Sequence, residues 1–233
     1  MPEKAATFTY RSEVTKEAAL RFISHLDYAA LIERAICRAK LPVVYSEGFN
    51  PHMKLSFASA LALGVTSDCE YMEFILSKDL CQPEVFERLS AQLPDGVTLK
   101  ALKKIEGKHK ALMSLADEAR YTISFSAEGQ EKEWAQAVQA FNNAEVCIYQ
   151  RVTPKKTRDI DIKQYVIGKI GIKTENNTIE LTAALKITPQ GSVKPAEIVE
   201  YIANTSGLSN NIADVDIRRT ELLSNGGNLM DAQ

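Results

Sequence analysis

Residues 45 to 54 hold the groups best suited to ligand binding, in the run YSEGFNPHMK. Gly48 permits a left-handed turn, and Asn50-Pro51 favours a further turn. Aromatic planes beside cations are what single-stranded nucleic acid or a nucleotide needs for stacking and phosphate contact. The alternative is a structural loop in which Phe49 fills the core and His52 caps a backbone carbonyl. We expect this loop to contact RNA through Tyr45, Ser46, Phe49, Asn50, His52 and Lys54.

The preceding segment, residues 20 to 40, has helical periodicity and carries a second set of candidate groups. Glu33 falls at the centre of a predicted apolar stripe that contains Phe22, Leu26, Ala29, Ala30, Ile36 and Cys37. A carboxylate buried there needs a cation or hydrogen-bond donors, so Glu33 is expected in a structural ion pair or as a functional acid. Together with Arg34 it would brace the loop. Arg21 and His25 share a face, and His25 is the candidate general base.

A third feature is the basic segment from residue 151 to residue 173, which holds seven Lys and Arg against two Asp. The whole chain, in contrast, has 28 Lys and Arg against 30 Asp and Glu. A local excess of cations could hold phosphates, in which case binding would weaken steeply with salt. The alternative is a solvated loop. The expected RNA contacts here are Lys155, Lys156 and Arg158.

Composition restricts the class of protein but names no reaction. The chain has 233 residues, of which 45% are hydrophobic and 25% charged, as in ordinary globular proteins rather than disordered, collagenous or coiled-coil ones. Its four cysteines are scattered and form no CxxC pair, so no metal site is expected. With neither a signal peptide nor an apolar run of membrane-spanning length, the protein is expected to be cytoplasmic.

The elements that must position these groups follow a repeated order. Strands are predicted at 7–14, 55–58, 70–76 and 97–102, with helices at 20–40 and 83–93, and the order strand-helix-strand-strand-helix-strand then recurs from residue 120 with a longer middle loop. The predicted fold is α+β, with two ferredoxin-like (βαββαβ) halves whose antiparallel sheets carry helices on one face. The expected domains are 1–104 and 119–223, joined by a connector at 105–118 and followed by a disordered tail at 224–233.

Several of these residues belong to one ordered series of short motifs along the chain. RFISHLD at 21–27 is followed by ERA at 33–35, LP at 41–42, the loop at 45–52, then Lys54, Ser56 and Phe57, and later by DIK at 161–163 and RT at 219–220. From about residue 7 to residue 223 the chain resembles the bacterial radical SAM-linked (radical SAM-associated) protein family, a domain of unknown function. Met53 and Ala60 stand where the family pattern has prolines.

The resemblance implies partners more than an activity. Members of that family occur fused to, or encoded beside, a radical SAM protein, often near genes for ribosomal proteins and RNA processing. In the partner, a cysteine triad would hold a [4Fe-4S] cluster and S-adenosylmethionine. Because this chain has no such triad, we expect it to bind no cofactor and to have no catalytic activity of its own. Its expected partners are a radical SAM protein and RNA or the ribosome, with no membrane.

Two other functions remain open at this point. A weaker similarity of arrangement, to RNA-processing proteins of CRISPR systems with paired ferredoxin-like domains, favours a metal-independent RNA endonuclease. His25 would be its general base, and Arg21, Lys54 or the basic segment would stabilise the phosphorane. The other alternative is a scaffold whose sheets only dock a partner protein.

Overall fold

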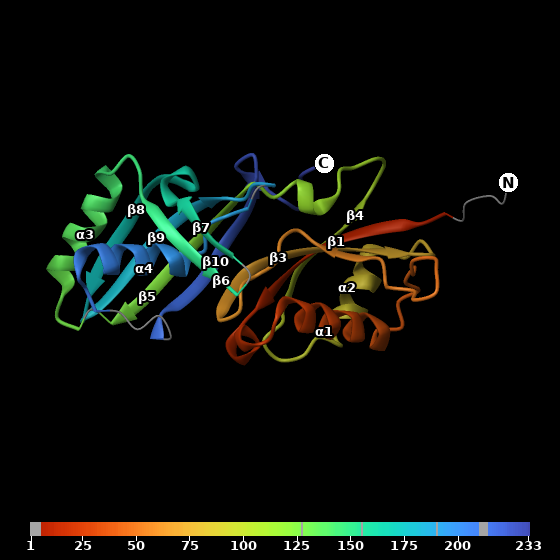
Figure 1. Ribbon diagram of the computed structural model, residues 1–233. Helices are drawn as coiled ribbons and strands as arrows, with labels where there is room; N and C mark the ends of the chain where they lie inside the picture. The colour runs from red at the N-terminus through yellow and green to blue at the C-terminus, as the bar shows by residue number, and fades with distance from the viewer. Residues whose placement is uncertain (1–5, 127, 155, 190, 210–213) are drawn as a thin grey trace. The chain divides into compact units, whose positions relative to one another are not determined.

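The computed structural model describes residues 6–126, 128–154, 156–189, 191–209 and 214–233. Helices and mostly antiparallel strands make up an α+β protein, which confirms the predicted class (Figure 1). The chain divides into two compact units: unit 1 is Met1–Ala116 with Leu222–Gln233, and unit 2 is Asp117–Glu221. None of the helices in the described ranges is long and apolar enough to cross a membrane.

Unit 1 places its strands side by side in the order β4-β1-β3-β2, with antiparallel neighbours throughout. Along the chain its elements are β1 (Phe8–Lys16), a 3-10 turn η1 (Ala18–Phe22), α1 (His25–Arg38), β2 (Leu55–Phe57), β3 (Val65–Leu76), α2 (Gln82–Ser90), β4 (Leu99–Ile105) and a 3-10 turn η2 (Leu112–Ser114). The predicted strand order along the chain is therefore present here, although β3 begins earlier than residue 70.

The core of unit 1 lies on one face of this sheet. Because side chains alternate along a strand, the even-numbered residues of β1 and β3 point to the same side. They include Tyr10, Val14 and Phe74, which are buried in one cluster with Ile32 of α1 and Leu89 of α2. Both helices therefore cover the same face of the sheet, as Figure 1 shows for α1 and α2.

The first helix begins later than predicted. The Ser24 hydroxyl accepts a hydrogen bond from the backbone N–H of Asp27 at 3.1 Å, so Ser24 is the N-cap and α1 starts at His25. The preceding residues form the separate turn η1 instead of the first turn of a helix from residue 20. At the other end of α1, the Arg88 guanidinium of α2 donates to the Ala39 carbonyl at 3.0 Å and so satisfies a free carbonyl.

The predicted apolar stripe of this helix is also wrong. The buried side chains of α1 are Tyr28, Ile32, Ala35 and Ile36, whereas Leu26 is 79% exposed. Glu33 is half-buried at the edge of this face and does not lie at its centre. Both faces of α1 are rich in apolar residues, and the side facing the sheet includes Tyr28, whose hydroxyl donates to the Thr15 carbonyl at 2.7 Å.

The opposite face of the unit 1 sheet carries a buried polar layer. Arg11 of β1 is fully buried and forms an ion pair with Glu73 of β3 at 2.8 Å. Arg11 also donates to the carbonyls of Leu229 and Ala232. The predicted disordered tail from residue 224 is therefore a wrong prediction: it contains the short strand β11 (Gly227–Asn228), and the Leu229 side chain is fully buried. The polar composition of this segment suggested disorder, and it gave no sign that Leu229 would be buried or that backbone carbonyls would accept hydrogen bonds from Arg11.

The strands of unit 2 lie side by side in the order β10-β5-β9-β8. Its elements are β5 (Glu118–Ser126), α3 (Glu131–Asn143), β6 (Ile148–Thr153), β7 (Lys156–Asp161), a 3-10 turn η3 (Ile162–Gln164), β8 (Val166–Glu175), β9 (Thr178–Lys186), α4 (Pro195–Ser206) and β10 (Asp216–Ser224). Trp134 of α3 is fully buried and meets Phe125 of β5 edge to face, with ring centroids 4.7 Å apart.

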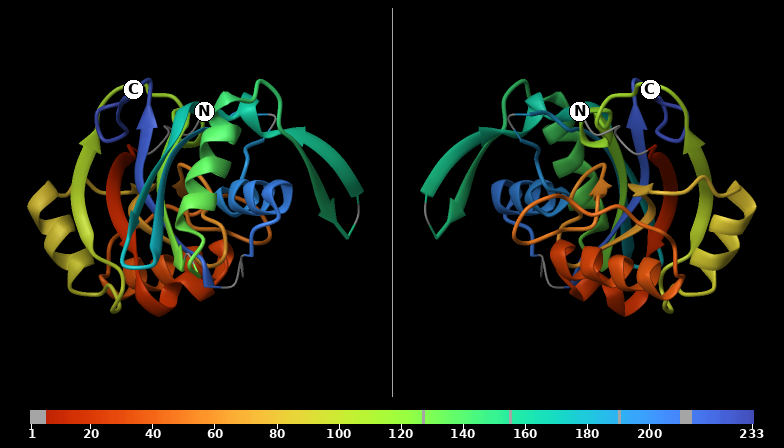
Figure 2. Two further views of the ribbon diagram at one scale, coloured as in Figure 1. Left: turned by 90° about the vertical axis from the view of Figure 1, so that its left-hand side faces the viewer. Right: turned by 90° about the vertical axis from the view of Figure 1, so that its right-hand side faces the viewer.

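Strands β6 and β7 form a separate two-stranded sheet, where the sequence predicted one strand followed by a basic loop. Figure 2 shows this hairpin, in teal, extending away from the rest of unit 2. The Arg151 guanidinium holds the Glu197 carboxylate of α4 through two hydrogen bonds of 2.6 Å, and the Tyr149 hydroxyl donates to Glu200 at 2.8 Å. Two side chains of β6 thus attach the hairpin to α4.

Candidate functional site

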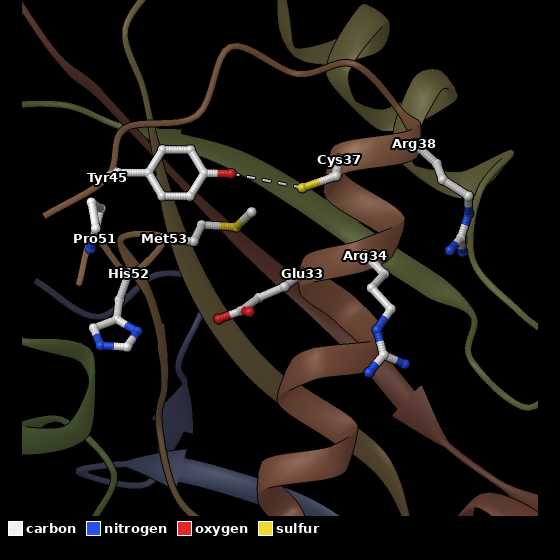
Figure 3. Close-up of a pocket in the computed structure, with 8 residues that line it drawn as sticks. All are labelled: Glu33, Arg34, Cys37, Arg38, Tyr45, Pro51, His52 and Met53. Atoms are coloured by element: carbon white, nitrogen blue, oxygen red, sulfur yellow. Dashed lines mark hydrogen bonds between the residues drawn. The ribbon is translucent and has the colours of Figure 1, made fainter.

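An open cavity of about 470 Å³ lies in unit 1 between α1 and the loop that follows it. Its volume is within the range typical of small-molecule sites, about 300 to 1,000 Å³. The helix and the loop contribute equally to the lining, which consists of Glu33, Arg34, Cys37, Arg38, Tyr45, Pro51, His52 and Met53 (Figure 3). Four residues predicted from the sequence, Glu33, Arg34, Tyr45 and His52, therefore meet at one place.

The loop side of the cavity is held by a short ladder of backbone contacts. Tyr45 and Met53 form an isolated antiparallel bridge. The Ser46 N–H donates to the His52 carbonyl at 2.7 Å, and the His52 N–H donates to the Ser46 hydroxyl at 2.9 Å. Gly48 turns the tip with φ of 123°, a conformation that L side chains rarely adopt. The sequence-predicted Ser46 therefore closes the loop, and the residues between it and His52 form a projecting tip.

Tyr45 and Cys37 join the two walls of the cavity. The Tyr45 hydroxyl and the Cys37 thiol lie 3.8 Å apart, and Figure 3 shows the phenol reaching across toward the helix. This hydrogen bond, together with partial burial and the nearby charge of Glu33, raises the pKa of Tyr45. The phenol therefore stays protonated at neutral pH and keeps its capacity to donate a hydrogen bond.

The charged residues of α1 divide between two sides of the helix. Figure 3 shows the Glu33 carboxylate directed into the space beside His52, whereas the guanidinium groups of Arg34 and Arg38 point away from Tyr45 and His52. Arg38 donates to the Gln92 carbonyl at 2.7 Å, and Arg34 is exposed. Glu33 therefore places a carboxylate acceptor inside the cavity, and the two arginine side chains of its lining point away from Tyr45 and His52.

The tip of the loop is exposed. Phe49 is fully exposed, so the structural alternative in which this ring fills the core is wrong. Asn50, His52 and Lys54 are also exposed, and Met53 between them is buried. The loop thus presents one aromatic ring and one lysine to solvent beside the cavity.

Arg21 lies in η1 and His25 is the first residue of α1, and both are outside the lining of the cavity. Arg21 Nε donates to the Gly64 carbonyl at 2.8 Å, and its guanidinium lies 5.6 Å from the ring centroid of Phe22. The His25 ring meets Phe57 edge to face at 5.2 Å. Both side chains, to which the endonuclease hypothesis assigns catalytic roles, therefore make structural contacts within unit 1.

The basic segment belongs to unit 2 and is folded. Lys156 and Arg158 are exposed on β7, and Lys155 lies outside the described residues. Arg151 is engaged with Glu197, and Lys163 donates to the Phe141 carbonyl at 3.1 Å. Part of the positive charge that the sequence assigned to ligand binding thus holds unit 2 together.

Four residues of the cavity were not predicted as site residues: Cys37, Arg38, Pro51 and Met53. Helical spacing could have indicated two of them, because Cys37 follows Glu33 by four residues and Arg38 follows Arg34 by four. Among the residues that the structure describes, no group of three or more His, Cys, Asp or Glu side chains could hold a metal ion. No disulfide joins the two exposed cysteines, Cys37 and Cys81, or the two buried ones, Cys69 and Cys147.

The family of the chain follows from a match that covers most of its length. A model of the family described as "uncharacterized protein conserved in bacteria", DUF2344, matches residues 9–195, so the protein belongs to this family. The matched region includes all of the cavity and the β6–β7 hairpin. A comparison with curated proteins gave no match.

Comparison with solved structures shows a shared fold. A chain in the crystal structure of a Cbf5-Nop10-Gar1 complex is 10% identical, with a TM-score of 0.50, and the match covers 93% of this protein and 50% of that chain. A chain of an archaeal box H/ACA sRNP Nop10-Cbf5 complex is also 10% identical, with a TM-score of 0.46, over 95% of this protein and 52% of that chain. The protein thus spans about half the length of these chains, and at this identity the likeness concerns the fold alone.

Proposed function

We propose that this protein is an accessory protein, without catalytic activity of its own, that binds RNA or a ribosome-associated substrate for a partner radical SAM enzyme. The observation that carries the RNA part is the fully exposed Phe49 ring on a closed loop beside the cavity. A solvent-exposed aromatic ring on an ordered loop offers a stacking plane to an unpaired base without first paying the cost of ordering the loop.

The electrostatics around this ring support the same function. Arg34 and Arg38 of α1 belong to the lining of the cavity, and Lys54 is exposed on the loop next to the lining residue Met53. Phosphates held by such cations would bring bases within reach of Phe49 and Tyr45. Lys156 and Arg158, on the hairpin of unit 2, are the proposed additional phosphate contacts.

The partner enzyme is proposed from the resemblance to the radical SAM-linked family. Its cluster and S-adenosylmethionine would be bound by the partner, and this protein would supply the recognition of the target. Radical chemistry requires a fixed target and the exclusion of water, which a separate recognition module can provide.

We also propose that each unit is a ferredoxin-like domain. In unit 1 the order β4-β1-β3-β2 is combined with helices after β1 and β3. In unit 2 the order β10-β5-β9-β8 is combined with helices after β5 and β9, and the β6–β7 hairpin is an insertion between α3 and β8. Both orders correspond to the split βαβ arrangement.

The test is RNA binding of the purified protein at several salt concentrations, with Phe49→Ala and Lys54→Glu as variants. We expect affinity to fall as salt rises, and to fall by roughly tenfold in Phe49→Ala, since base stacking on an aromatic ring is worth about 1 to 3 kcal/mol. The matched control is Lys108→Glu, which makes the same charge change on the connector beside His109; that histidine contacts Glu73 on the opposite face of the sheet. Equal loss in Lys54→Glu and Lys108→Glu would contradict the proposed site.

The partner is tested by affinity capture under anaerobic conditions that keep iron-sulfur clusters intact. Recovery of a radical SAM protein is expected, and its absence from repeated captures would count against the accessory role. Incubation with total RNA separates the endonuclease alternative, since cleavage that is lost in His25→Ala would assign catalysis to this chain. If the enzyme is captured but the protein binds no RNA, the remaining hypothesis is a scaffold that only docks the partner enzyme.

A further inference from the structure

The inner wall of the cavity has a chemical character that phosphate binding does not explain. Its groups are the Glu33 carboxylate, the Tyr45 phenol, the Cys37 thiol and the His52 imidazole. An ionised carboxylate accepts hydrogen bonds and donates none. A phosphate placed against Glu33 would meet a like charge, so the backbone of a bound nucleic acid belongs outside the cavity, beside the exposed lining residue Arg34.

A group that pairs with Glu33 inside the cavity must therefore carry hydrogen-bond donors. The volume of about 470 Å³ leaves room for a planar ring, and the wall opposite α1 is the Tyr45 side chain. Nucleobases are planar, stack on aromatic rings and present donors and acceptors on the Watson–Crick edge. A base inside the cavity could donate hydrogen bonds to Glu33, while its sugar and phosphate remain outside, away from the carboxylate.

The four bases differ in how their edges match a carboxylate. Guanine presents two adjacent donors, the N1–H and the N2 amino group, which match the two oxygens of one carboxylate. Adenine, cytosine and uracil each place at least one acceptor beside their donor, and that acceptor would face a carboxylate oxygen. A bidentate, charge-assisted pair is roughly twice as strong as a neutral one, so Glu33 favours guanine over the other bases.

Building on the proposed RNA-binding function, we propose that this cavity is a guanine pocket in which the Glu33 carboxylate accepts hydrogen bonds from the N1–H and N2 amino groups. Tyr45 forms the opposing wall, and when the Cys37 thiol donates to its hydroxyl the phenol O–H can donate to an acceptor on the same base. Phe49, at the projecting tip, stacks the neighbouring base. The site would thus read one guanosine within a single strand.

The test compares short single-stranded RNA oligonucleotides of one length that differ at one position, in a uridine background. Guanosine, inosine and uridine are placed at this position, because inosine lacks only the N2 amino group. We expect the guanosine oligonucleotide to bind about tenfold more tightly than the inosine one, the size expected for one lost hydrogen bond to a charged group. Glu33→Gln should reduce this ratio to near one.

The matched control is Glu87→Gln, which removes an exposed carboxylate from α2. Losing one negative charge strengthens RNA binding generally in both variants, so only the ratio between oligonucleotides isolates the role of Glu33. RNA binding with equal affinity for guanosine and inosine would overturn the guanine pocket and leave the RNA-binding function standing. Absence of binding to any oligonucleotide at low salt would overturn both. A ratio that Glu33→Gln leaves unchanged would assign base recognition to another site.

Discussion

The side chain with the largest expected effect on the stability of unit 1 is Arg11. It is completely buried, and its guanidinium pairs with the Glu73 carboxylate, whose side chain is 8% exposed. Two carbonyls of the C-terminal segment accept hydrogen bonds from its Nη1 group. An ion pair buried in this way does not by itself add stability, because desolvation offsets the Coulomb attraction. Breaking it from one side is costly because an unpaired charge remains in the interior.

Replacing Arg11 by leucine is expected to lower the free energy of unfolding by about 3 to 5 kcal/mol, because the Glu73 charge then loses its partner inside the protein. Urea unfolding followed by circular dichroism measures this change. The double variant Arg11→Leu/Glu73→Leu should recover much of the loss. Lys103→Ala, which breaks a pair with Asp231 between largely exposed side chains, should have a far smaller effect. Equal losses in Arg11→Leu and the double variant would contradict this account.

At the scale of single elements, the β6–β7 hairpin depends on α4. A lone two-stranded sheet is marginally stable in water, and here Arg151 and Tyr149 attach it to Glu197 and Glu200. Arg158 lies directly opposite Arg151 in the hairpin and is exposed. Two arginines at one register position therefore have different roles, one as an anchor and one as a solvent-facing cation.

The variant Arg151→Gln is expected to speed amide hydrogen exchange in the hairpin while the amides of β5 and β9 keep their protection. The reason is that local opening costs less once the two hydrogen bonds to the Glu197 carboxylate are lost. Arg158→Gln is the matched control and should leave exchange unchanged. Faster exchange throughout unit 2 in Arg151→Gln would instead show that the anchor supports the whole sheet.

The second anchor gives the hairpin a dependence on pH. Burial, with the hydrogen bond to Glu200, raises the pKa of Tyr149 from 10.0 to about 12. Because the pKa in the folded state exceeds the unfolded value, the stabilisation is complete below pH 10 and is lost as the pH rises through 12. The measurement is the difference in phenolate absorbance between the wild type and Tyr149→Phe as the pH rises. This difference should titrate near pH 12, and titration near pH 10 would contradict the prediction.

The elements also show where the sequence was informative. Ser24 with Asp27 three residues later is a readable helix start, yet the periodicity from residue 20 suggested a longer helix, and Ala18–Phe22 instead form η1. The loop at 45–54 was recognised from its residue types, and it does line the cavity. The buried face of α1 was misassigned because the exposed Leu26 and Cys37, eleven residues apart, share a helix face just as the buried Ile32 and Ile36 do, four residues apart. Which face is buried depends on the sheet, and local periodicity does not contain that information.

For the whole molecule, the path of the chain is not a simple succession of two domains. Unit 2 is inserted between Ala116 and Leu222, and the last twelve residues return to unit 1. The return is stabilised by the burial of Leu229 and by the carbonyls that Arg11 requires. Unit 1 is therefore completed only when the C-terminal segment is present.

Deletion of residues 227–233 should destabilise unit 1 by at least about 3 kcal/mol, because it removes a buried leucine and the two carbonyls that accept hydrogen bonds from Arg11 Nη1. The single tryptophan of the chain makes the result specific, since Trp134 is buried in unit 2 and its fluorescence reports that unit. We expect the urea midpoint seen by far-ultraviolet circular dichroism to fall while the Trp134 transition stays in place. Removing Gln233 alone, which is exposed, is the control and should change neither. A Trp134 transition that moves together with the circular dichroism signal would show that the C-terminal segment supports both units.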